Sequence, residues 1–436
     1  MFSDVKCQLP GPNSKKFIEK SQIYEPGGTS QHAPIVWDSA NGVLIKDVDG
    51  NTYIDFTSGV LVTNVGHCHP KLVDAVQKAA AKLMNCYNFP TPERVTLAQR
   101  LVEITPENLD VAFMVTTGSD ATEAAIRAAK RYTGCYEILS FYGGFHGRTG
   151  GAMSVAGTTG TKKKYGPVMP GSIQAPYAYC YRCPFKAKPE TCDFLCVDFL
   201  DRVIEAQSTG DLAALIVEPY QGSSGFIVPP DGYLTRLQEW AKDKGILFIL
   251  DEVQASFGRT GKMFALEWED LRPNLLCMGK GLGSGVPAAA MMAESRIMKA
   301  LEAGEMSSTN GGNPLSCAAA LAVIDIMEEE KLPENALKVG GYLFERFKNV
   351  QKDVDILGDV RGRGLVIGLE FVTDKESKTP SGEIAAEVIR RCCQNGVVMG
   401  SVGAYGHILR VAPPLVITME QAEEAADIIE KVLREF

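Results

Sequence analysis

Short apolar runs alternate with stretches of amphipathic helix through the middle of this 436-residue sequence. The runs 111–115, 136–141, 213–217 and 246–250 have the length of buried strands. Strands that alternate with helices over short connections predict a mostly parallel sheet covered by helices on both faces, and therefore an α/β fold. Binding sites in such sheets lie at the carboxyl ends of the strands.

Glycine and aspartate mark the expected ends of two helices in this region. We expect a helix over residues 121–130 that ends at Gly134. A second helix should be capped by Asp231 and end at Gly245, directly before the next apolar run.

The sequence changes character after about Met327, where a polar stretch leads into short strand-like runs and a last helix from about Met419. This pattern predicts a smaller α+β domain at the C-terminus. We expect an N-terminal segment over residues 1–60 that packs with the small domain, a large domain over residues 61–327 and the small domain over residues 328–436.

Two strand ends carry side chains that suit one kind of cofactor. Lys280 follows an apolar run between two glycines, and Asp251 ends another run 29 residues upstream. Burial disfavours a charged ammonium, so a lysine there can present a neutral amine to a carbonyl. A carboxylate can keep a pyridine nitrogen protonated while the lysine binds the aldehyde as a Schiff base. The pair predicts a pyridoxal 5′-phosphate enzyme, although either residue alone could be a surface lysine or a helix cap.

Two further strand ends could serve the same site. Gly118 and Ser119 join a strand to a helix N-terminus, where backbone N–H groups favour a phosphate. An ordinary capped turn is the alternative, and no P-loop or G-x-G-x-x-G motif is present. Phe145 and Arg148 follow the next strand and could stack on a ring and bind a carboxylate, or be a core and a surface residue.

The composition limits the class of protein. The net charge is −9, which gives no basic surface for nucleic acid or anionic lipid. The first ten residues lack the apolar core of a signal peptide, and no apolar run has membrane-spanning length. We expect the twelve cysteines to be free thiols. These features favour a cytoplasmic enzyme without a nucleic-acid or membrane partner.

Four cysteines have the C-x2-C…C-x3-C spacing of a possible zinc or iron–sulfur site: Cys180, Cys183, Cys192 and Cys196. The two pairs lack the separation that zinc ribbons have. We therefore assign no metal site and keep this cluster as a weak candidate. His67 and His69 lack a third ligand nearby and are expected to belong to a turn before Pro70.

Four motifs occur in the order and spacing of one enzyme family: residues 218–225, 251–254, 257–261 and 279–281. The sequence resembles the class III aminotransferases, subgroup II of pyridoxal-phosphate fold type I, from about Asp47 to Leu415. Its motifs are most similar to those of 4-aminobutyrate aminotransferases. The resemblance implies a pyridoxal 5′-phosphate-dependent homodimer, or a higher oligomer, with small amino and 2-oxo acids as substrates.

The resemblance also assigns roles around the cofactor ring. Lys280 would bind the aldehyde and then move the proton, and Asp251 would pair with the ring nitrogen. Val253 and Phe145 would pack on opposite faces of the ring. Gln254 would bond its 3′-oxygen.

Other roles concern the phosphate and the substrate. Gly118 and Ser119 would bind the phosphate, and Thr309 matches a threonine that reaches the phosphate of the neighbouring subunit. That match implies an active site shared within a homodimer. Arg410 matches the arginine that binds the α-carboxylate of the substrate.

Four positions bear on the substrate. Ser223 stands where ω-amino-acid members have a glutamate that masks the arginine. The mask is absent here, as it is in dialkylglycine decarboxylase. Val60 and Phe145, however, replace the glutamine and tryptophan of that decarboxylase. Arg148 matches the residue that 4-aminobutyrate aminotransferases use for the distal carboxylate. The site is therefore more similar to an aminotransferase than to a decarboxylase.

The expected reaction is transamination between an amino acid, best 4-aminobutyrate or a related ω-amino acid, and 2-oxoglutarate. An α-amino-acid racemase or epimerase is an alternative, because an unmasked Arg410 suits α-carboxylates. An α-amino-acid aminotransferase is another, and a decarboxylating transaminase is less favoured. A cofactor-binding regulator would need an appended DNA-binding segment. The sequence does not identify the amino donor, or distinguish a dimer from a tetramer.

Overall fold

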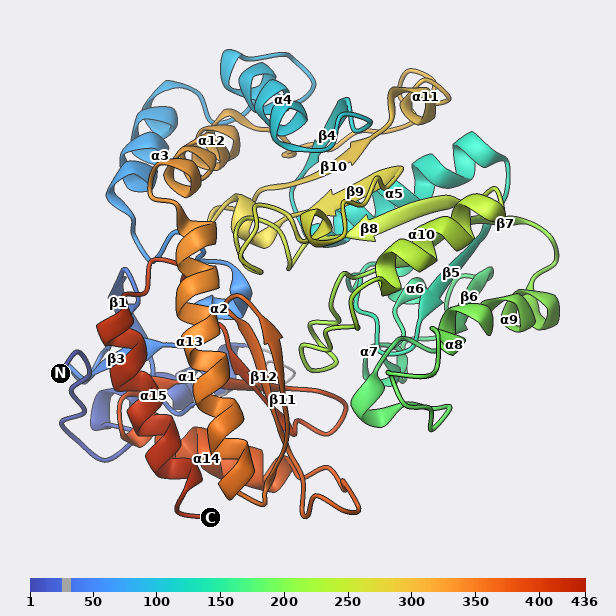
Figure 1. Cartoon of the computed structure of the whole chain (residues 1–436). Helices are drawn as coiled ribbons and strands as arrows, with labels where there is room; N and C mark the ends of the chain where they lie inside the picture. The colour runs from blue at the N-terminus through green and yellow to red at the C-terminus, as the bar shows by residue number, and fades with distance from the viewer. Residues whose placement is uncertain (26–32) are drawn as a thin grey trace. The chain divides into compact units, whose positions relative to one another are not determined.

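The computed structural model describes residues 1–25 and 33–436, and this part of the chain forms two compact units (Figure 1). The smaller unit combines Met1–Pro70 with Lys331–Phe436, and the larger unit is Lys71–Glu330. The chain therefore leaves the smaller unit once and returns to it after the larger unit is complete.

The larger unit is built on a seven-stranded sheet with the order β4-β10-β9-β8-β7-β5-β6. Its strands are β4 Val111–Val115, β5 Glu137–Phe141, β6 Ser172–Ala175, β7 Leu212–Val217, β8 Leu247–Asp251, β9 Leu275–Met278 and β10 Ala289–Ala293. Neighbouring strands are parallel except at β10, which is antiparallel to both β4 and β9. The mostly parallel sheet predicted from the sequence is confirmed.

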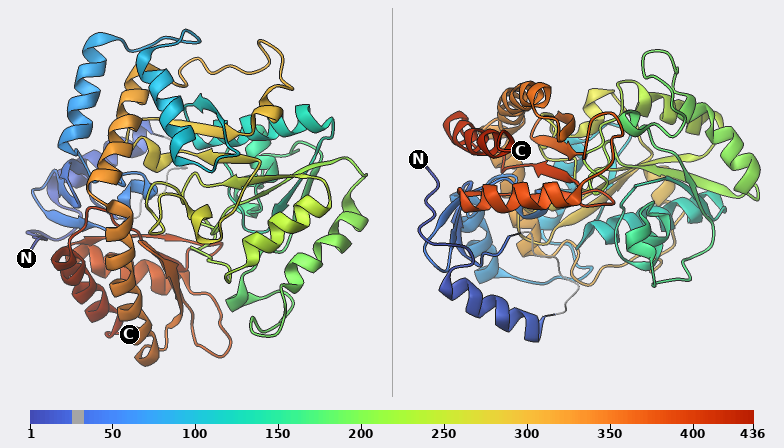
Figure 2. Two further views of the ribbon diagram at one scale, coloured as in Figure 1. Left: turned by 45° about the horizontal axis from the view of Figure 1, so that its top comes forward. Right: turned by 90° about the horizontal axis from the view of Figure 1, so that it is seen from below.

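Helices of the larger unit connect and cover these strands (Figure 2). They are α3 Pro70–Lys82, α4 Pro92–Ile104, α5 Gly118–Thr133, α6 Gly150–Val155, α7 Thr159–Lys162, α8 Leu195–Asp198, α9 Leu200–Gln207, α10 Tyr233–Asp243, α11 Ser295–Met298 and α12 Pro314–Glu329. Short 3-10 turns cover Cys180–Arg182, Ala265–Trp268 and Lys280–Leu282.

Helix α5 packs closely on the centre of the sheet because its buried face is rich in alanine. Ala121, Ala125 and Ala128 are fully buried and join one apolar core with residues of β8 and β9, such as Ile249 and Cys277. Small side chains let the helix backbone approach the strands. This packing fixes the N-terminus of α5 beside the carboxyl ends of the strands.

Of the helix caps predicted from the sequence, Gly134 is confirmed and Asp231 is wrong. Gly134 ends α5 in the left-handed conformation with φ of 74°, as predicted. Asp231 does not cap α10, because the N-cap residue is Gly232 with φ of 88° and no side-chain cap bond. A left-handed residue there favours glycine, so the chain turns at Gly232 before the helix begins at Tyr233. Gly245 follows α10 with φ of 70°.

The smaller unit contains two four-stranded sheets and joins both ends of the chain. One sheet has the order β1-β2-β3-β13, from Trp37–Asn41, Leu44–Asp47, Thr52–Asp55 and Val397–Val398. The other has the order β11-β12-β15-β14, from Leu357–Arg363, Val366–Phe371, Ile408–Val411 and Gly400–Val402. The parallel pairing of β13 with β3 connects the C-terminal part to the N-terminal segment.

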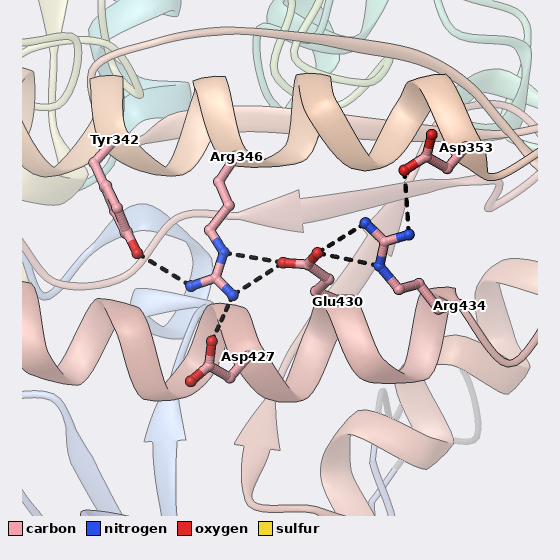
Figure 3. A network of polar contacts seen from close by, with 6 residues as sticks. All are labelled: Tyr342, Arg346, Asp353, Asp427, Glu430 and Arg434. Carbon is pink, nitrogen blue, oxygen red and sulfur yellow. Dashed lines mark hydrogen bonds and ion pairs between the residues drawn. The ribbon is translucent and has the colours of Figure 1, made fainter.

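The helices of the smaller unit are α1 Pro12–Tyr24, α2 Ser58–Leu61, α13 Leu332–Asp353, α14 Gly382–Gln394 and α15 Met419–Leu433. A network of charges joins α13 to α15 (Figure 3). At its centre, Arg346 donates from Nε and Nη2 to Glu430 at 3.0 and 2.9 Å, and Arg434 donates to the same carboxylate at 3.0 and 3.1 Å. Several partly exposed charges that share one carboxylate hold two helices in register better than one isolated pair.

None of the helices in the described part of the chain has the length and apolar character needed to cross a membrane.

Candidate active site

A cavity of the larger unit is lined by segments that follow five strands of its sheet. The segments after β4, β5, β7 and β9 and the end of β8 contribute its lining: Thr117, Gly118, Ser119, Phe145, His146, Gly147, Glu218, Ser223, Asp251, Val253, Gln254 and Lys280. Parallel strands bring their carboxyl ends to one edge, so residues far apart in the sequence meet there. The cavity contains eight of the nine site residues expected after these strands; Arg148 is not in its lining.

Asp251 and His146 form a buried polar pair in this cavity. Nδ1 of His146 lies 2.7 Å from Oδ2 of Asp251, and the other carboxylate oxygen accepts the N–H of Val253 at 3.0 Å. Burial by itself lowers the pKa of His146, but the hydrogen bond and charge of Asp251, together with Glu218, raise that pKa on balance. The imidazole therefore favours its protonated form and holds the carboxylate in one orientation.

Glu218 is a second buried carboxyl group beside this pair. Its two oxygens accept the backbone N–H groups of Phe145 at 2.8 Å and of Gly222 at 3.1 Å. Burial raises the pKa of Glu218 to about 7, and the charge of Asp251 adds to this effect while His146 opposes it. Glu218 thus fixes the backbone that carries Phe145.

The sequence gives only weak evidence that His146 and Glu218 belong to the site. His146 directly follows Phe145, and Glu218 stands at a strand end, but neither position says which partner the side chain meets. His146 and Asp251 are 105 residues apart in the chain, and their contact depends on the tertiary fold.

Lys280 directly follows Gly279 after β9 and begins a short 3-10 turn. It is half-buried and adopts φ of 41°, in the left-handed region that a lysine rarely occupies. Such backbone strain is found where the surrounding structure holds a functional side chain in place. Lys280 and Asp251 line the same cavity.

The N-terminus of α5 forms one edge of the cavity. Thr117 caps the helix through reciprocal bonds with Asp120, and Gly118 and Ser119 form its first turn. A Cβ atom on Gly118 would lie only 2.4 Å from Cγ1 of Val253, so glycine is needed for this close approach. Unpaired N–H groups and the helix dipole make such an end suitable for a phosphate.

The side-chain oxygen of Gln254, in the lining of the same cavity, is left without a partner among the described residues. This Oε1 atom is buried. The oxygen and nitrogen of such an amide can be exchanged by a flip, so either could face a ligand. An unsatisfied buried amide, a helix N-terminus, a carboxylate and a lysine in one cavity fit a phosphorylated pyridine aldehyde.

Two predicted residues of the larger unit lie on exposed loops. Arg148 is exposed, its guanidinium lies 5.9 Å from the centre of the Phe145 ring, and it makes no ion pair with any described residue. Thr309 is also exposed, in a turn before α12. Ser223, in contrast, is half-buried.

The remaining predicted residues belong to the smaller unit. Val60 is 47% exposed, and Arg410 on β15 is only 3% exposed. Burial lowers the pKa of Arg410, while the charge of Asp55 acts in the opposite direction. Nε of Arg410 has no hydrogen-bond partner in the described part of the chain. A buried guanidinium with an unused donor is suited to an anionic ligand.

The cysteine cluster does not form a metal site in this structure. All four of its thiols are free and half-buried. Within residues 1–25 and 33–436, no three His, Cys, Asp or Glu side chains are grouped so that they could hold a metal ion. Burial, and then the neighbouring thiols, raises the pKa of Cys196 to about 12, which favours the thiol over the thiolate that binds metals.

Comparison with known proteins agrees with this geometry. The family model of the class III aminotransferases matches residues 27–433. The chain is 37% identical to the alanine/serine racemase of Pyrococcus horikoshii over 100% of this chain and 93% of the relative. It is equally 37% identical to the 4-aminobutyrate aminotransferase of Mycobacterium leprae, over 98% of this chain and 97% of the relative.

A solved structure extends the comparison to the cofactor. An amine transaminase from an uncultivated Pseudomonas species, crystallised in a PLP-bound form, superimposes with a TM-score of 0.89 and 29% identity over 99% of each chain. The likeness covers the larger and the smaller unit of the fold.

Proposed function

Because the chain belongs to the class III aminotransferase family, we propose that it transfers an amino group from 4-aminobutyrate, or a related ω-amino acid, to 2-oxoglutarate. The protein is an enzyme, and pyridoxal 5′-phosphate is its cofactor. This cofactor supplies a protonated pyridine ring that withdraws electrons and acidifies the substrate carbon next to nitrogen.

The buried pair of Asp251 and His146 would keep the ring nitrogen protonated. The Asp251 carboxylate would accept a hydrogen bond from that N–H group, and His146 holds the orientation of the carboxylate. Nζ of Lys280, in the turn after β9, would hold the aldehyde of the cofactor and would remove and return the substrate proton. The backbone around Lys280 holds this amine in the cavity rather than in solvent.

Other side chains of the cavity hold the cofactor in place. Gly118 and Ser119 would bind the phosphate through the first turn of α5, and Gln254 would bond the ring oxygen. Phe145 and Val253 would cover the two faces of the ring. Restricting the ring in this way keeps the substrate carbon within reach of Lys280.

The assignment of the substrate depends mainly on Arg148. Its guanidinium is exposed and has no ion pair among the described residues, so it is available to a distal carboxylate. Arg410, assigned from the family alone, binds the carboxylate next to the reacting carbon in the acceptor. Ser223 is too short to reach and mask an arginine as a glutamate would. These roles favour substrates with a carboxylate at a distance from the amine.

The test is a panel of amino donors with 2-oxoglutarate or pyruvate as acceptor. Transamination of 4-aminobutyrate with 2-oxoglutarate, at the highest kcat/KM of the panel, is the expected result. Turnover restricted to α-amino donors would contradict the ω-amino-acid assignment.

Racemisation of an α-amino acid is the second candidate, since a racemase and a 4-aminobutyrate aminotransferase are equally identical to this chain. Ser223 leaves an α-carboxylate site unmasked, which suits that reaction. Incubation of one L-amino acid without any 2-oxo acid distinguishes the two. Sustained formation of the D-isomer indicates a racemase, whereas an aminotransferase stops after one turnover.

We further propose a cytoplasmic homodimer with a shared active site. Thr309 is exposed in one chain, where a second subunit can place its phosphate against it. The loop before α4 exposes several large apolar residues, including Met84 at 62% and Phe89 at 75%. Such a surface is typical of a protein interface. Analytical ultracentrifugation at micromolar concentration should show a dimer, and a monomer that retains full activity would contradict the proposal.

A further inference from the structure

Glu123 holds the segment that carries Arg148. It lies one helical turn after Ser119 on α5, so both side chains share one face of the helix. The backbone N–H of Arg148 donates to Oγ of Ser119 at 3.3 Å. The hydroxyl of the next residue, Thr149, donates to Oε1 of Glu123 at 2.6 Å. Arg148 is therefore fixed to α5 on both sides of its Cα atom.

The same carboxylate also caps the N-terminus of α6. The N–H groups of Gly151 and Ala152 donate to Oε1 of Glu123 at 2.7 and 3.0 Å. Thr149, the N-cap residue, makes no cap bond with its own helix, so Glu123 supplies the acceptor that the first turn needs. A Cβ on Gly151 would lie 2.3 Å from Oε2 of Glu123, and glycine there lets the carboxylate reach the helix end.

The guanidinium of Arg148 is not held by comparable hydrogen bonds within the described residues. It is exposed, and within the described residues its side chain makes only a ring contact with Phe145, at 5.9 Å from the ring centre. The position from which it extends is therefore set by the backbone of residues 147–152, and that backbone is bonded to Ser119 and Glu123.

We propose that Glu123 is a positioning residue that determines the preference for dicarboxylate substrates by orienting Arg148. This inference rests on the proposed function, in which Arg148 binds the distal carboxylate. Helix α5 then has two roles. Its first turn binds the phosphate, and its second turn fixes the distance from the cofactor to the arginine that binds the carboxylate. Loss of the Glu123 carboxylate frees the loop without removing any group that touches the substrate.

The test compares KM values for 2-oxoglutarate and pyruvate in Glu123→Ala, Arg148→Ala and the double variant. Glu123→Ala should raise KM for 2-oxoglutarate roughly tenfold, which corresponds to about 1.4 kcal/mol. It should leave kcat and the KM for pyruvate within about twofold, because pyruvate has no distal carboxylate. In the Arg148→Ala background, the same substitution should have no further effect on 2-oxoglutarate.

Three further variants control for a general loss of rigidity in the structure. Glu123→Gln should restore most of the affinity, because an amide oxygen still accepts the hydroxyl and N–H bonds. Thr149→Val removes a single bond and should shift KM for 2-oxoglutarate in the same direction by less, even if Glu123→Ala folds poorly. Glu107→Ala removes an exposed glutamate of the same unit and should change nothing.

Equal losses with both acceptors, or losses that add to those of Arg148→Ala, would overturn the inference. Binding of glutarate, measured by calorimetry, repeats the double-variant cycle without turnover. If Arg148→Ala changes the KM values for 2-oxoglutarate and pyruvate by the same factor, the proposed function is contradicted. Coupling of Glu123 to Arg148 in glutarate binding would then still support the positioning role, and its absence would contradict that role as well.

Discussion

Nδ1 of His146 lies 2.7 Å from Oδ2 of Asp251, and both side chains are at most 4% exposed. A buried carboxylate with a hydrogen-bonded partner keeps its orientation. The pair holds Asp251 at the end of β8 in the orientation that the proposed role at the cofactor ring nitrogen requires. It also makes His146 as important to the site as residues that the family motifs emphasise.

His146→Ala should lower kcat roughly 10- to 100-fold, because losing a hydrogen bond to a buried charge costs about 1.5–3 kcal/mol. His146→Asn retains a possible donor and should lose less. Stopped-flow or steady-state rates, together with cofactor content, measure the effect. A kcat that stays within about twofold of the wild type at full cofactor occupancy would contradict a role in orienting Asp251.

Glu252, next to Asp251, gives a prediction for stability against pH. It is fully buried and accepts the N–H groups of Ala265 and Leu266, both at 2.7 Å. Burial raises its pKa from the ordinary 4.5 to about 8. The folded state therefore binds more protons than the unfolded state between these values, and stability falls as the pH rises from about 4.5 through about 8.

Glu252→Gln removes this dependence, because the amide carries no charge. It keeps only one of the two acceptor oxygens, so the slope of stability against pH is compared rather than the absolute stability. Relative to the variant, the wild type should lose on the order of a few kcal/mol of unfolding free energy between pH 5 and pH 8. Urea denaturation at several pH values measures the difference. The exposed Glu107→Gln is the control, and parallel pH curves for wild type and Glu252→Gln would show that Glu252 does not titrate in this range.

Lys280→Ala should abolish steady-state turnover while the protein still retains cofactor through the N-terminus of α5 and the Asp251 pair. The other groups bind and orient, and Lys280 is the only side chain in the cavity lining with an amine. Rates and bound cofactor are measured without added amine. The matched control is Lys299→Ala at an exposed position after α11. Retained turnover in Lys280→Ala would exclude Lys280 as the catalytic amine.

The fold follows from the sequence to a large extent because short apolar runs have few alternatives to buried strands. The runs at 111–115 and 213–217 become β4 and β7, and the last helix begins at Met419 as expected. The antiparallel direction of β10 could not be predicted, because Ala289–Ala293 carries no signal for strand direction. Its direction depends on which neighbours the completed sheet offers.

The site was less accessible to sequence analysis than the fold. The strand-end rule brings Asp251 and Lys280 to one cavity, because the carboxyl ends of parallel strands meet at one edge. Which side chain then bonds to which depends on rotamers and loop paths. The bonds from His146 to Asp251 and from Thr149 to Glu123 connect different segments, and no local pattern encodes them.

The most direct test of the proposed function is the acceptor preference of Arg148→Ala. A distal carboxylate that loses its bidentate arginine should bind more weakly by about 2 kcal/mol or more, so KM for 2-oxoglutarate should rise roughly 30-fold or more. KM for pyruvate should not change, and activity with 4-aminobutyrate as donor should fall in parallel with that for 2-oxoglutarate. An equal loss with 2-oxoglutarate and pyruvate would contradict the assignment of Arg148 to the distal carboxylate, and with it transamination of an ω-amino acid as the function.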